Sequence, residues 1–198
     1  CVVDRLIQQA VLQVLQKRWD PTFSEASFGF RPGRSAHQAV AQAQRYIAEG
    51  YSVVVDLDLE KFFDRVNHDS LMARVAARVA DKRVLKLVRA FLNAGVMEDG
   101  VIKPTEVGTP QGAVASPLLA NIYLHYVFDL WAKRWREHHA HGQVIIMRYA
   151  DDIVVGFEHA AEAKRFLMDL QQRMEKFALS LHPDKTRLIE FGRFAAPK

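Results

Sequence analysis

Two adjacent carboxylates, Asp151 and Asp152, lie between two short apolar runs, and this arrangement constrains the fold more than any other feature of the chain. The runs are residues 144–147 before the pair and residues 153–155 after it. Apolar segments of strand length on both sides of a short polar centre predict a β-hairpin with the charges at its tip. Like charges held among apolar neighbours repel each other and lose hydration, so a cation stabilises them. A solvated turn is the alternative, because aspartate is common in turns.

A second acidic pair lies upstream, in residues 53–59, where aspartates alternate with apolar side chains. On a strand, this alternation puts Asp56 and Asp58 on one face, with their Cα atoms roughly 7 Å apart, and the apolar side chains on the other face. An acidic strand beside an acidic hairpin offers the carboxylate oxygens that Mg²⁺ prefers. Three carboxylates from two strands are enough for a two-metal site, in which the ions stand about 4 Å apart.

Seven short blocks follow one another along the chain in a recognisable order. They are FGFRPGRS at 28–35, DLDLEKFFD at 56–64, GTPQG at 108–112, SPLLAN at 116–121, YADD at 149–152, HPDKT at 182–186 and FGRF at 191–194. Together they resemble the reverse transcriptase/maturase family encoded by group II introns. The resemblance covers nearly the whole chain, and so many blocks in this order are very hard to obtain by chance.

The apolar periodicity and the resemblance indicate the same fold class. Helices are predicted over residues 2–18, 35–50, 67–79, 82–94, 113–138 and 159–178, strands over 51–59 and 187–191, and an irregular hairpin over 95–108. Strand, long helix, hairpin and helix is the order of a split βαβ unit, an antiparallel sheet backed by helices. The resemblance implies that this α+β unit is the palm of a right-hand polymerase, with partial helical fingers.

The resemblance also implies a domain organisation. Residues 1–198 are expected to form a fragment of a single reverse transcriptase domain. Residues 1–50 and about 65–110 are assigned to the fingers, and residues 51–64 and 111–198 to the palm. Further N-terminal finger segments and a helical thumb are expected to be absent, so we expect the isolated fragment to synthesise little or no DNA.

The activity implied by the resemblance is RNA-directed DNA polymerase. Two Mg²⁺ ions would assist the transfer of a nucleotide from a dNTP to a primer 3′-hydroxyl. The implied partners are an RNA template, a DNA or RNA primer, a dNTP and intron RNA, in the setting of intron mobility and splicing. Two alternatives stay open: a splicing maturase that binds RNA without polymerisation, and a reverse transcriptase of antiphage defence or CRISPR adaptation.

Catalytic and metal-binding roles are carried over onto matching residues. Asp58, Asp151 and Asp152 are expected to be catalytic and to hold the metal ions, with the backbone carbonyl of Leu59 as a further ligand. Asp56 stays open as the alternative ligand, because it shares the strand face of Asp58.

Nucleotide-binding roles fall on three residues. Phe63, five residues after Asp58, is expected to act as a steric gate against a ribose 2′-hydroxyl, with Phe62 facing the core; ordinary core packing is the alternative for Phe63. Gln111 is expected to contact the nucleotide. Lys185 is expected to neutralise or protonate the leaving pyrophosphate, although an exposed lysine at this place would also be unremarkable.

Three arginines are expected to contact nucleic acid. Arg31 and Arg34 bracket a Pro-Gly pair and could present two guanidinium groups to phosphates, or they could be solvated loop residues. Arg193 is expected to contact the primer or to pack beneath it.

Composition narrows the class of protein only broadly. Of the 198 residues, 49% are hydrophobic and 25% charged, which is typical of a globular protein, and the net charge of +4 favours polyanionic partners. The single cysteine, Cys1, excludes an internal disulfide and fits a reducing compartment. No apolar run approaches the roughly 20 residues needed to span a bilayer. We therefore expect a cytoplasmic, bacterial protein with no membrane contact.

Overall fold

The computed structural model describes residues 2–48, 53–94, 96–98, 101–103, 107–109 and 113–190. The chain divides into two compact units, each made of two segments. Unit 1 comprises Cys1–Phe23 and Lys61–Tyr126, and unit 2 comprises Ser24–Glu60 and Val127–Lys198. Residues 24–48 thus group with the main sheet, whereas we had expected them among the fingers. The finger and palm assignment itself is a functional division, and it stays a prediction.

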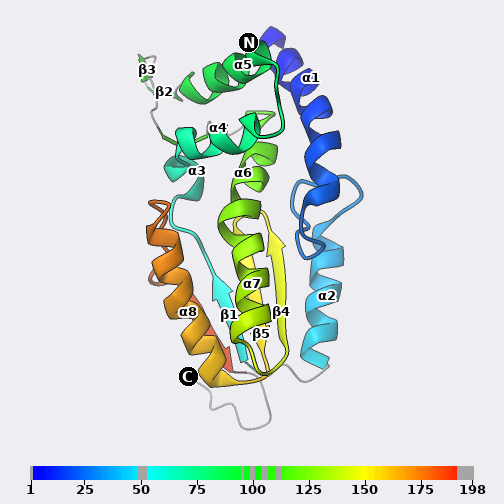
Figure 1. The fold of residues 1–198 in the computed structure, drawn as a ribbon, viewed down its shortest axis with the longest axis vertical. Helices are drawn as coiled ribbons and strands as arrows, with labels where there is room; N and C mark the ends of the chain where they lie inside the picture. Colours follow the sequence, from blue (N-terminus) through cyan, green and yellow to red (C-terminus); the bar gives the residue numbers. More distant parts are fainter. Residues whose placement is uncertain are drawn as a thin grey trace. The chain divides into compact units, whose positions relative to one another are not determined.

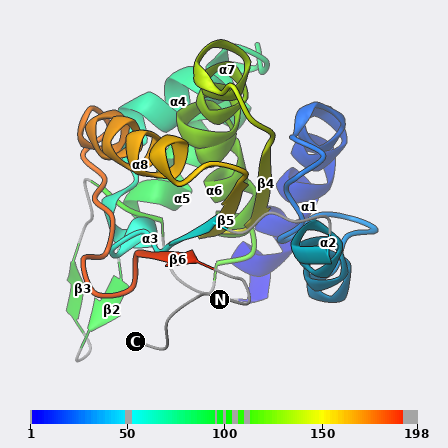
Figure 2. The same cartoon turned by 90° about the horizontal axis from the view of Figure 1, so that it is seen from below.

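Unit 2 is built on one four-stranded antiparallel sheet. Its strands follow the order β4-β5-β1-β6, and their bounds are Val144–Tyr149 (β4), Asp152–Phe157 (β5), Val53–Leu57 (β1) and Arg187–Glu190 (β6). Three helices accompany it: α2 (Ala36–Ala48), α7 (Leu130–His139) and α8 (Ala160–Glu175). Helices α7 and α8 lie on the same face of the sheet, and α2 packs beside the edge strand β4 (Figures 1 and 2). The predicted antiparallel sheet backed by helices is confirmed.

An aromatic cluster holds α7 and α8 on the sheet. Trp135 of α7, Phe157 of β5 and Phe166 of α8 meet with ring centroids 5.0 to 6.2 Å apart. The indole of Trp135 also donates a hydrogen bond of 2.8 Å to Asp169 of α8. Val55 and Val155 pair between neighbouring strands and are fully buried. Val53, Val55 and Leu57 of β1 share one buried face, so Asp56 lies on the opposite face, where its side chain is exposed, as the alternation predicts.

Unit 1 is mostly helical. Its elements are α1 (Val2–Trp19), the 3₁₀ turn η1 (Asp20–Thr22), α3 (Phe62–Arg65), α4 (His68–Ala76), α5 (Lys82–Asn93), α6 (Ser116–Leu124) and the hairpin of β2 (Val96–Glu98) and β3 (Val101–Lys103). Helix α6 packs against α1 and α4. Side chains cap two of the helices: Asn67 accepts from the Ser70 amide, and Asp81 accepts from the Arg83 amide, both at 2.8 Å.

Two elements differ from the prediction. The single helix predicted over residues 113–138 consists of α6, a π-helical turn η2 (His125–Asp129) and α7. Apolar periodicity does not register one inserted residue in a helix, so the π turn was not foreseen. Strand β1 ends at Leu57, and Leu59 forms only an isolated antiparallel bridge with Leu181. Asp58 therefore lies just beyond the regular strand.

Candidate active site

The acidic hairpin has the geometry that the sequence predicts. Tyr149 at the end of β4 pairs with Asp152 at the start of β5, so Ala150 and Asp151 form the whole turn. Ala150 has a φ of +57°, in the left-handed region that glycine normally occupies in such turns. A side chain at a positive φ stores strain, which persists only where the surroundings enforce it.

A buried arginine enforces this turn. The Arg148 guanidinium donates 2.8 Å hydrogen bonds from Nε and Nη2 to the two carboxylate oxygens of Asp129, and a 2.9 Å bond from Nη1 to the Ala150 carbonyl. The Arg148 side chain is 0% exposed and that of Asp129 is 3% exposed. This ion pair was not predicted from the sequence. The available signal was an arginine on a strand face shared with buried apolar residues.

A glycine packs against the same turn from the loop before α2. The Phe28 amide donates to the Arg148 carbonyl, and the Arg148 amide donates to the Ala26 carbonyl, both at 2.8 Å, so this loop extends the edge of β4. A Cβ atom at Gly29 would lie 2.3 Å from the Ala150 backbone nitrogen, closer than any side chain can approach. The FGFRPGRS block thus supports the hairpin through its backbone.

Four carboxylates influence one another at this end of the sheet. Leu57 pairs with Ile153, so the next residues outward, Asp58 and Asp152, emerge at the same end of adjacent strands. Burial raises the pKa of Asp151, and repulsion from Asp152 and Asp58 raises it further. Burial also raises the pKa of Asp56, as does Asp152, while Arg187 opposes the rise. Asp58 thus acts on Asp151, whereas Asp56 is coupled to the hairpin through Asp152, and the choice of Asp58 as the metal ligand stays a prediction.

The donor chemistry of this end suits a hard divalent cation, because it offers several carboxylate oxygens, and burial and neighbouring carboxylates raise the pKa values of Asp56 and Asp151. Within the described residues, however, no three acidic, histidine or cysteine side chains converge into a ready cluster. The Lys185 ammonium lies 3.2 Å from a carboxylate oxygen of Asp58 and supplies positive charge there. Leu59 is held in place from both sides, because the Asp58 carbonyl accepts from the His182 amide at 2.8 Å and the Glu60 amide donates to the Ser180 carbonyl at 2.9 Å.

The two loop arginines differ in what surrounds them. Arg31 is only 8% exposed, and its Nη1 donates to the carbonyls of Ser24 at 2.7 Å and Ser27 at 2.9 Å. This bonding holds the Arg31 guanidinium against the loop backbone, and the expected contact of Arg31 with phosphates stays a prediction. The Arg34 side chain is 24% exposed and pairs with Glu25. Arg34 is therefore the better placed of the two for a contact with nucleic acid.

Of the described residues expected near the nucleotide, Phe63 belongs to unit 1 and Lys185 to unit 2. Phe63 is partly exposed and packs edge-on against Phe62, which is 2% exposed, as predicted. The Thr109 amide donates to the Phe63 carbonyl at 2.6 Å, and the Gly108 amide donates to the Val66 carbonyl at 2.8 Å. The segment that leads to the PQG block therefore runs beside Phe63. Gln111 and Arg193 lie outside the described residues, so their roles stay predictions.

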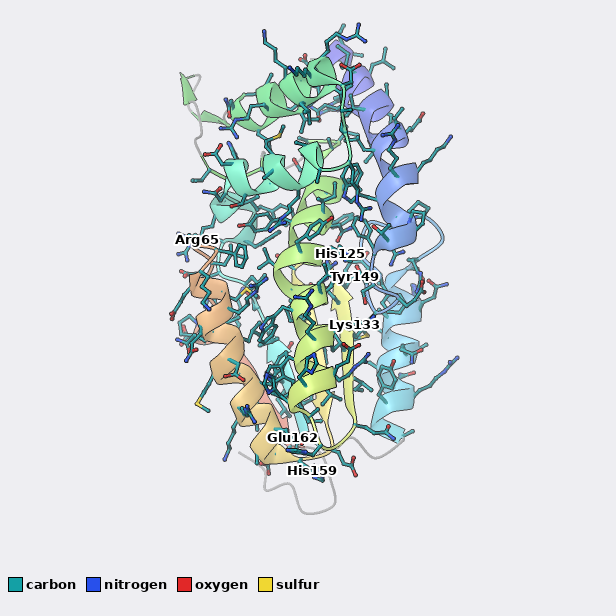
Figure 3. The ribbon with its side chains drawn as sticks, viewed as in Figure 1. Arg65, His125, Lys133, Tyr149, His159 and Glu162 are labelled. Carbon is teal, nitrogen blue, oxygen red and sulfur yellow. The ribbon has the colours of Figure 1, made fainter. Side chains whose placement is uncertain are left out.

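A further buried carboxylate serves the fold at the far end of unit 2. Glu162 accepts hydrogen bonds from the amides of His141 at 2.7 Å and Gly142 at 3.2 Å, which closes the loop between α7 and β4. Figure 3 shows Glu162 and His159 at the opposite end of the sheet from Tyr149. The Glu162 carboxylate is thus separate from the acidic hairpin.

Comparison with known proteins identifies similar sequences. The model of the family described as "Reverse transcriptase (RNA-dependent DNA polymerase)" matches residues 1–193. The "Group II intron-encoded protein LtrA" of Lactococcus lactis is 40% identical over 138 residues, which cover 68% of this chain and 23% of that protein. "Nuclear intron maturase 2, mitochondrial" of Arabidopsis thaliana is 34% identical over 107 residues, which cover 52% of this chain and 14% of that protein. The chain therefore spans less than a quarter of the length of these relatives.

Solved structures agree on the fold. The apo telomerase of Candida tropicalis superimposes with a TM-score of 0.69 over 97% of this chain and 38% of that chain, at 14% sequence identity. At this identity the likeness concerns the fold alone. Within the ranges that the structure describes, no helix is long and apolar enough to cross a membrane. The similar sequences come from bacteria, fungi and plants, so a bacterial source stays a prediction.

Proposed function

The chain belongs to the reverse transcriptase family, and from this premise we propose that it is the catalytic core of an RNA-directed DNA polymerase of the group II intron type. The observation that carries the proposal is the set of carboxylates at one end of the sheet: Asp58 follows β1, and Asp151 and Asp152 lie on a hairpin whose turn is held by a buried arginine. The partners we propose are an RNA template, a DNA or RNA primer, a dNTP and intron RNA.

In the proposed reaction the primer 3′-hydroxyl oxygen bonds to the α-phosphorus of the dNTP, and the bond to pyrophosphate breaks. Asp58, Asp151 and Asp152, with the Leu59 carbonyl, would hold two Mg²⁺ ions. When bound, such ions lower the pKa of the attacking hydroxyl and stabilise the leaving pyrophosphate.

The remaining residues position the reactants. Arg148 holds the turn, so the Asp151 and Asp152 carboxylates need little rearrangement before the reaction. Lys185 would leave Asp58 and neutralise or protonate the pyrophosphate. Phe63 would exclude a ribose 2′-hydroxyl, and Gln111 would contact the nucleotide.

The remaining proposed contacts are to nucleic acid. Arg34 would bind a phosphate of the template or primer, and Arg193 would contact the primer. Arg31 would contact a phosphate beside the loop that its guanidinium stabilises.

Splicing assistance is the second candidate function. The relatives named above are described as intron-encoded or as an intron maturase, which favours an intron setting over a role in defence or CRISPR adaptation. Splicing needs RNA binding but not the metal-binding carboxylates. A variant without Asp151 and Asp152 should therefore lose synthesis and keep splicing.

The test is primer extension on an RNA template with dNTPs and Mg²⁺, using the full-length protein and an Asp151→Ala, Asp152→Ala variant. We expect the variant to lose synthesis by about 10³-fold or more, the scale on which the loss of a catalytic group acts. A matched control removes two exposed carboxylates of the same unit, Glu137→Ala and Glu175→Ala, and should keep full activity. Equal synthesis by the protein and its Asp151/Asp152 variant would overturn the proposal.

A further inference from the structure

A groove of about 680 Å³ lies within unit 2, and neither Asp151 nor Asp152 lines it. It is bounded by the loop before α2, by one face of α2, by β4 and by the last turns of α7. The polar residues of its lining that matter here are Arg34, Gln38, Gln42, Arg45, Tyr46 and Arg136. None of them carries a catalytic role in the proposed reaction, apart from the expected phosphate contact of Arg34.

One face of α2 supplies a row of polar groups. Gln42 follows Gln38 by four residues, and Arg45 and Tyr46 follow Gln42 by three and four, so all of them lie along one side of the helix. From the first to the last the row is roughly 12 Å long, at 1.5 Å per residue. Two amides, a guanidinium and a phenol thus follow one another along the groove.

The charge of the groove is positive. Three arginines line it, against the single carboxylate of Glu25. Arg34 pairs with Glu25, and its guanidinium lies 5.3 Å from the centre of the Phe28 ring. Arg45 and Arg136 are exposed, and neither forms an ion pair within the part of the chain that the structure describes. Two guanidinium groups therefore face the groove without a protein anion to neutralise them.

The floor of the groove is apolar. Ile145 and Ile146 of β4 are only partly buried where they line it. Ile146 precedes Tyr149 by three residues, or roughly 10 Å along the strand, so the groove is close to the acidic turn but separate from it. A ligand in the groove could thus meet charged, amide and apolar groups together.

These groups match one class of ligand. Guanidinium groups bind phosphates, glutamine amides bind base edges and hydroxyls, and tyrosine and isoleucine side chains pack on base faces. An acidic peptide would use the arginines but neither the amide row nor the apolar floor. We propose that this groove binds a single-stranded segment of RNA or DNA, outside the carboxylate site. The inference rests on the proposed function, because it adds a second nucleic-acid contact to the same polymerase.

The test compares two charge-matched variants of the full-length protein. Arg45→Gln with Arg136→Gln removes the two unpaired groove charges, and Arg134→Gln with Lys164→Gln removes two exposed charges of the same unit outside the groove. Fluorescence anisotropy measures the affinity for short labelled single strands, RNA and DNA in separate arms, over a series of salt concentrations. All four substituted side chains are exposed, so folding should be preserved, and circular dichroism verifies it.

We expect the groove variant to bind single strands about tenfold more weakly, as the loss of charge-assisted contacts implies. The slope of log affinity against log salt should fall by about 1.4, because each phosphate contact on a single strand contributes roughly 0.7. The control variant should keep both values. An equal loss in both variants, or no loss in the groove variant, would overturn the proposal. A competition result would also overturn it. In that result, polyglutamate displaces the strands from the protein, and polyglutamate binds the groove variant more weakly than it binds the unsubstituted protein.

The same proteins separate this inference from the proposed function. The Asp151→Ala, Asp152→Ala variant should still bind single strands and fail to extend a primer. The groove variant should extend a saturating, pre-annealed primer and template at the normal rate. Synthesis by the Asp151/Asp152 variant would refute the polymerase mechanism and leave the groove proposal standing. Unchanged strand binding by the groove variant would refute only the proposal that the groove binds single strands.

Discussion

Arg148 and Asp129 form a two-bond ion pair inside unit 2, with both nitrogen–oxygen distances at 2.8 Å. The same guanidinium bonds to the carbonyl of Ala150, which has a left-handed conformation at the tip of the acidic hairpin. The conformation of the proposed catalytic turn therefore depends on a buried charge that a helical residue neutralises. This dependence leads to the first prediction.

Asp129→Ala should lower the free energy of unfolding by about 3–5 kcal/mol, because it leaves the buried Arg148 charge without its partner. Urea denaturation measures the loss. Replacing the pair together, by Asp129→Leu with Arg148→Met, should recover most of that stability, since apolar residues of similar volume often substitute for a buried pair. Primer extension should stay low in this double variant, because the bond to the Ala150 carbonyl is missing. Full synthesis would show that the bond is dispensable.

Gly29→Ala should disturb the hairpin, because its Cβ would meet the backbone of Ala150 at 2.3 Å and that of Tyr149 at 2.9 Å. Overpacking of this kind costs about 1–3 kcal/mol, and here the displaced backbone carries Asp151. The rate of synthesis should fall by more than the fraction of unfolded protein accounts for. Gly33→Ala is the control: nothing lies within 4 Å of its Cβ, and only its φ of +69° opposes the change, at about 1 kcal/mol. Equal activity of the two variants would show that the close approach of Gly29 to Ala150 does not matter for synthesis.

Asp151→Asn should raise the thermal stability of the metal-free protein near neutral pH, because burial and neighbouring carboxylates raise the pKa of Asp151. Between the unfolded and the raised folded pKa, the folded state binds more protons, so stability falls as pH rises through this window. The advantage of the variant should therefore shrink as pH is lowered to about 4, near the unfolded value. Thermal unfolding scans at several pH values measure the difference in unfolding temperature between the variant and the unsubstituted protein. A difference that does not change with pH would show that it does not come from the raised pKa of Asp151.

Lys185→Met should strengthen the binding of Mg²⁺ to the protein without nucleotide, because the Lys185 ammonium bonds to Asp58 at 3.2 Å and competes with a cation. The side chains are 60% and 31% exposed, so the pair is worth at most about 1 kcal/mol, or roughly fivefold in affinity. Calorimetric titration with Mg²⁺ is the measurement. Synthesis should fall in the same variant if Lys185 acts on pyrophosphate. Weaker Mg²⁺ binding would contradict the competition.

Asp58→Asn should abolish synthesis, whereas Asp56→Asn should keep it within about tenfold, since Asp58, unlike Asp56, is among the charges that act on Asp151. Primer extension at saturating Mg²⁺ compares the two variants, each of which removes one carboxylate charge at the end of β1. Loss of synthesis in the Asp56→Asn variant, with synthesis kept in the Asp58→Asn variant, would make Asp56 the metal ligand.

Local periodicity was enough to predict most of the secondary structure. The acidic hairpin, strand β1 and the helices α1, α2, α5 and α8 lie close to their predicted bounds, because alternation and helical spacing depend only on neighbouring residues. The placement of Asp56 on the exposed strand face and of Phe62 in the core followed from the same local rules.

Several features were decided only by tertiary structure. The burial of Arg31, the approach of Gly29 to Ala150 and the ion pair of Arg148 with Asp129 join residues far apart in the sequence. The preference for Asp58 over Asp56 depends in the same way on where the hairpin lies. A repeating pattern records which face of a strand or helix is buried, but not which distant group it meets. The sequence by itself therefore determined the carboxylates and their strands, and long-range packing decided how those carboxylates are held.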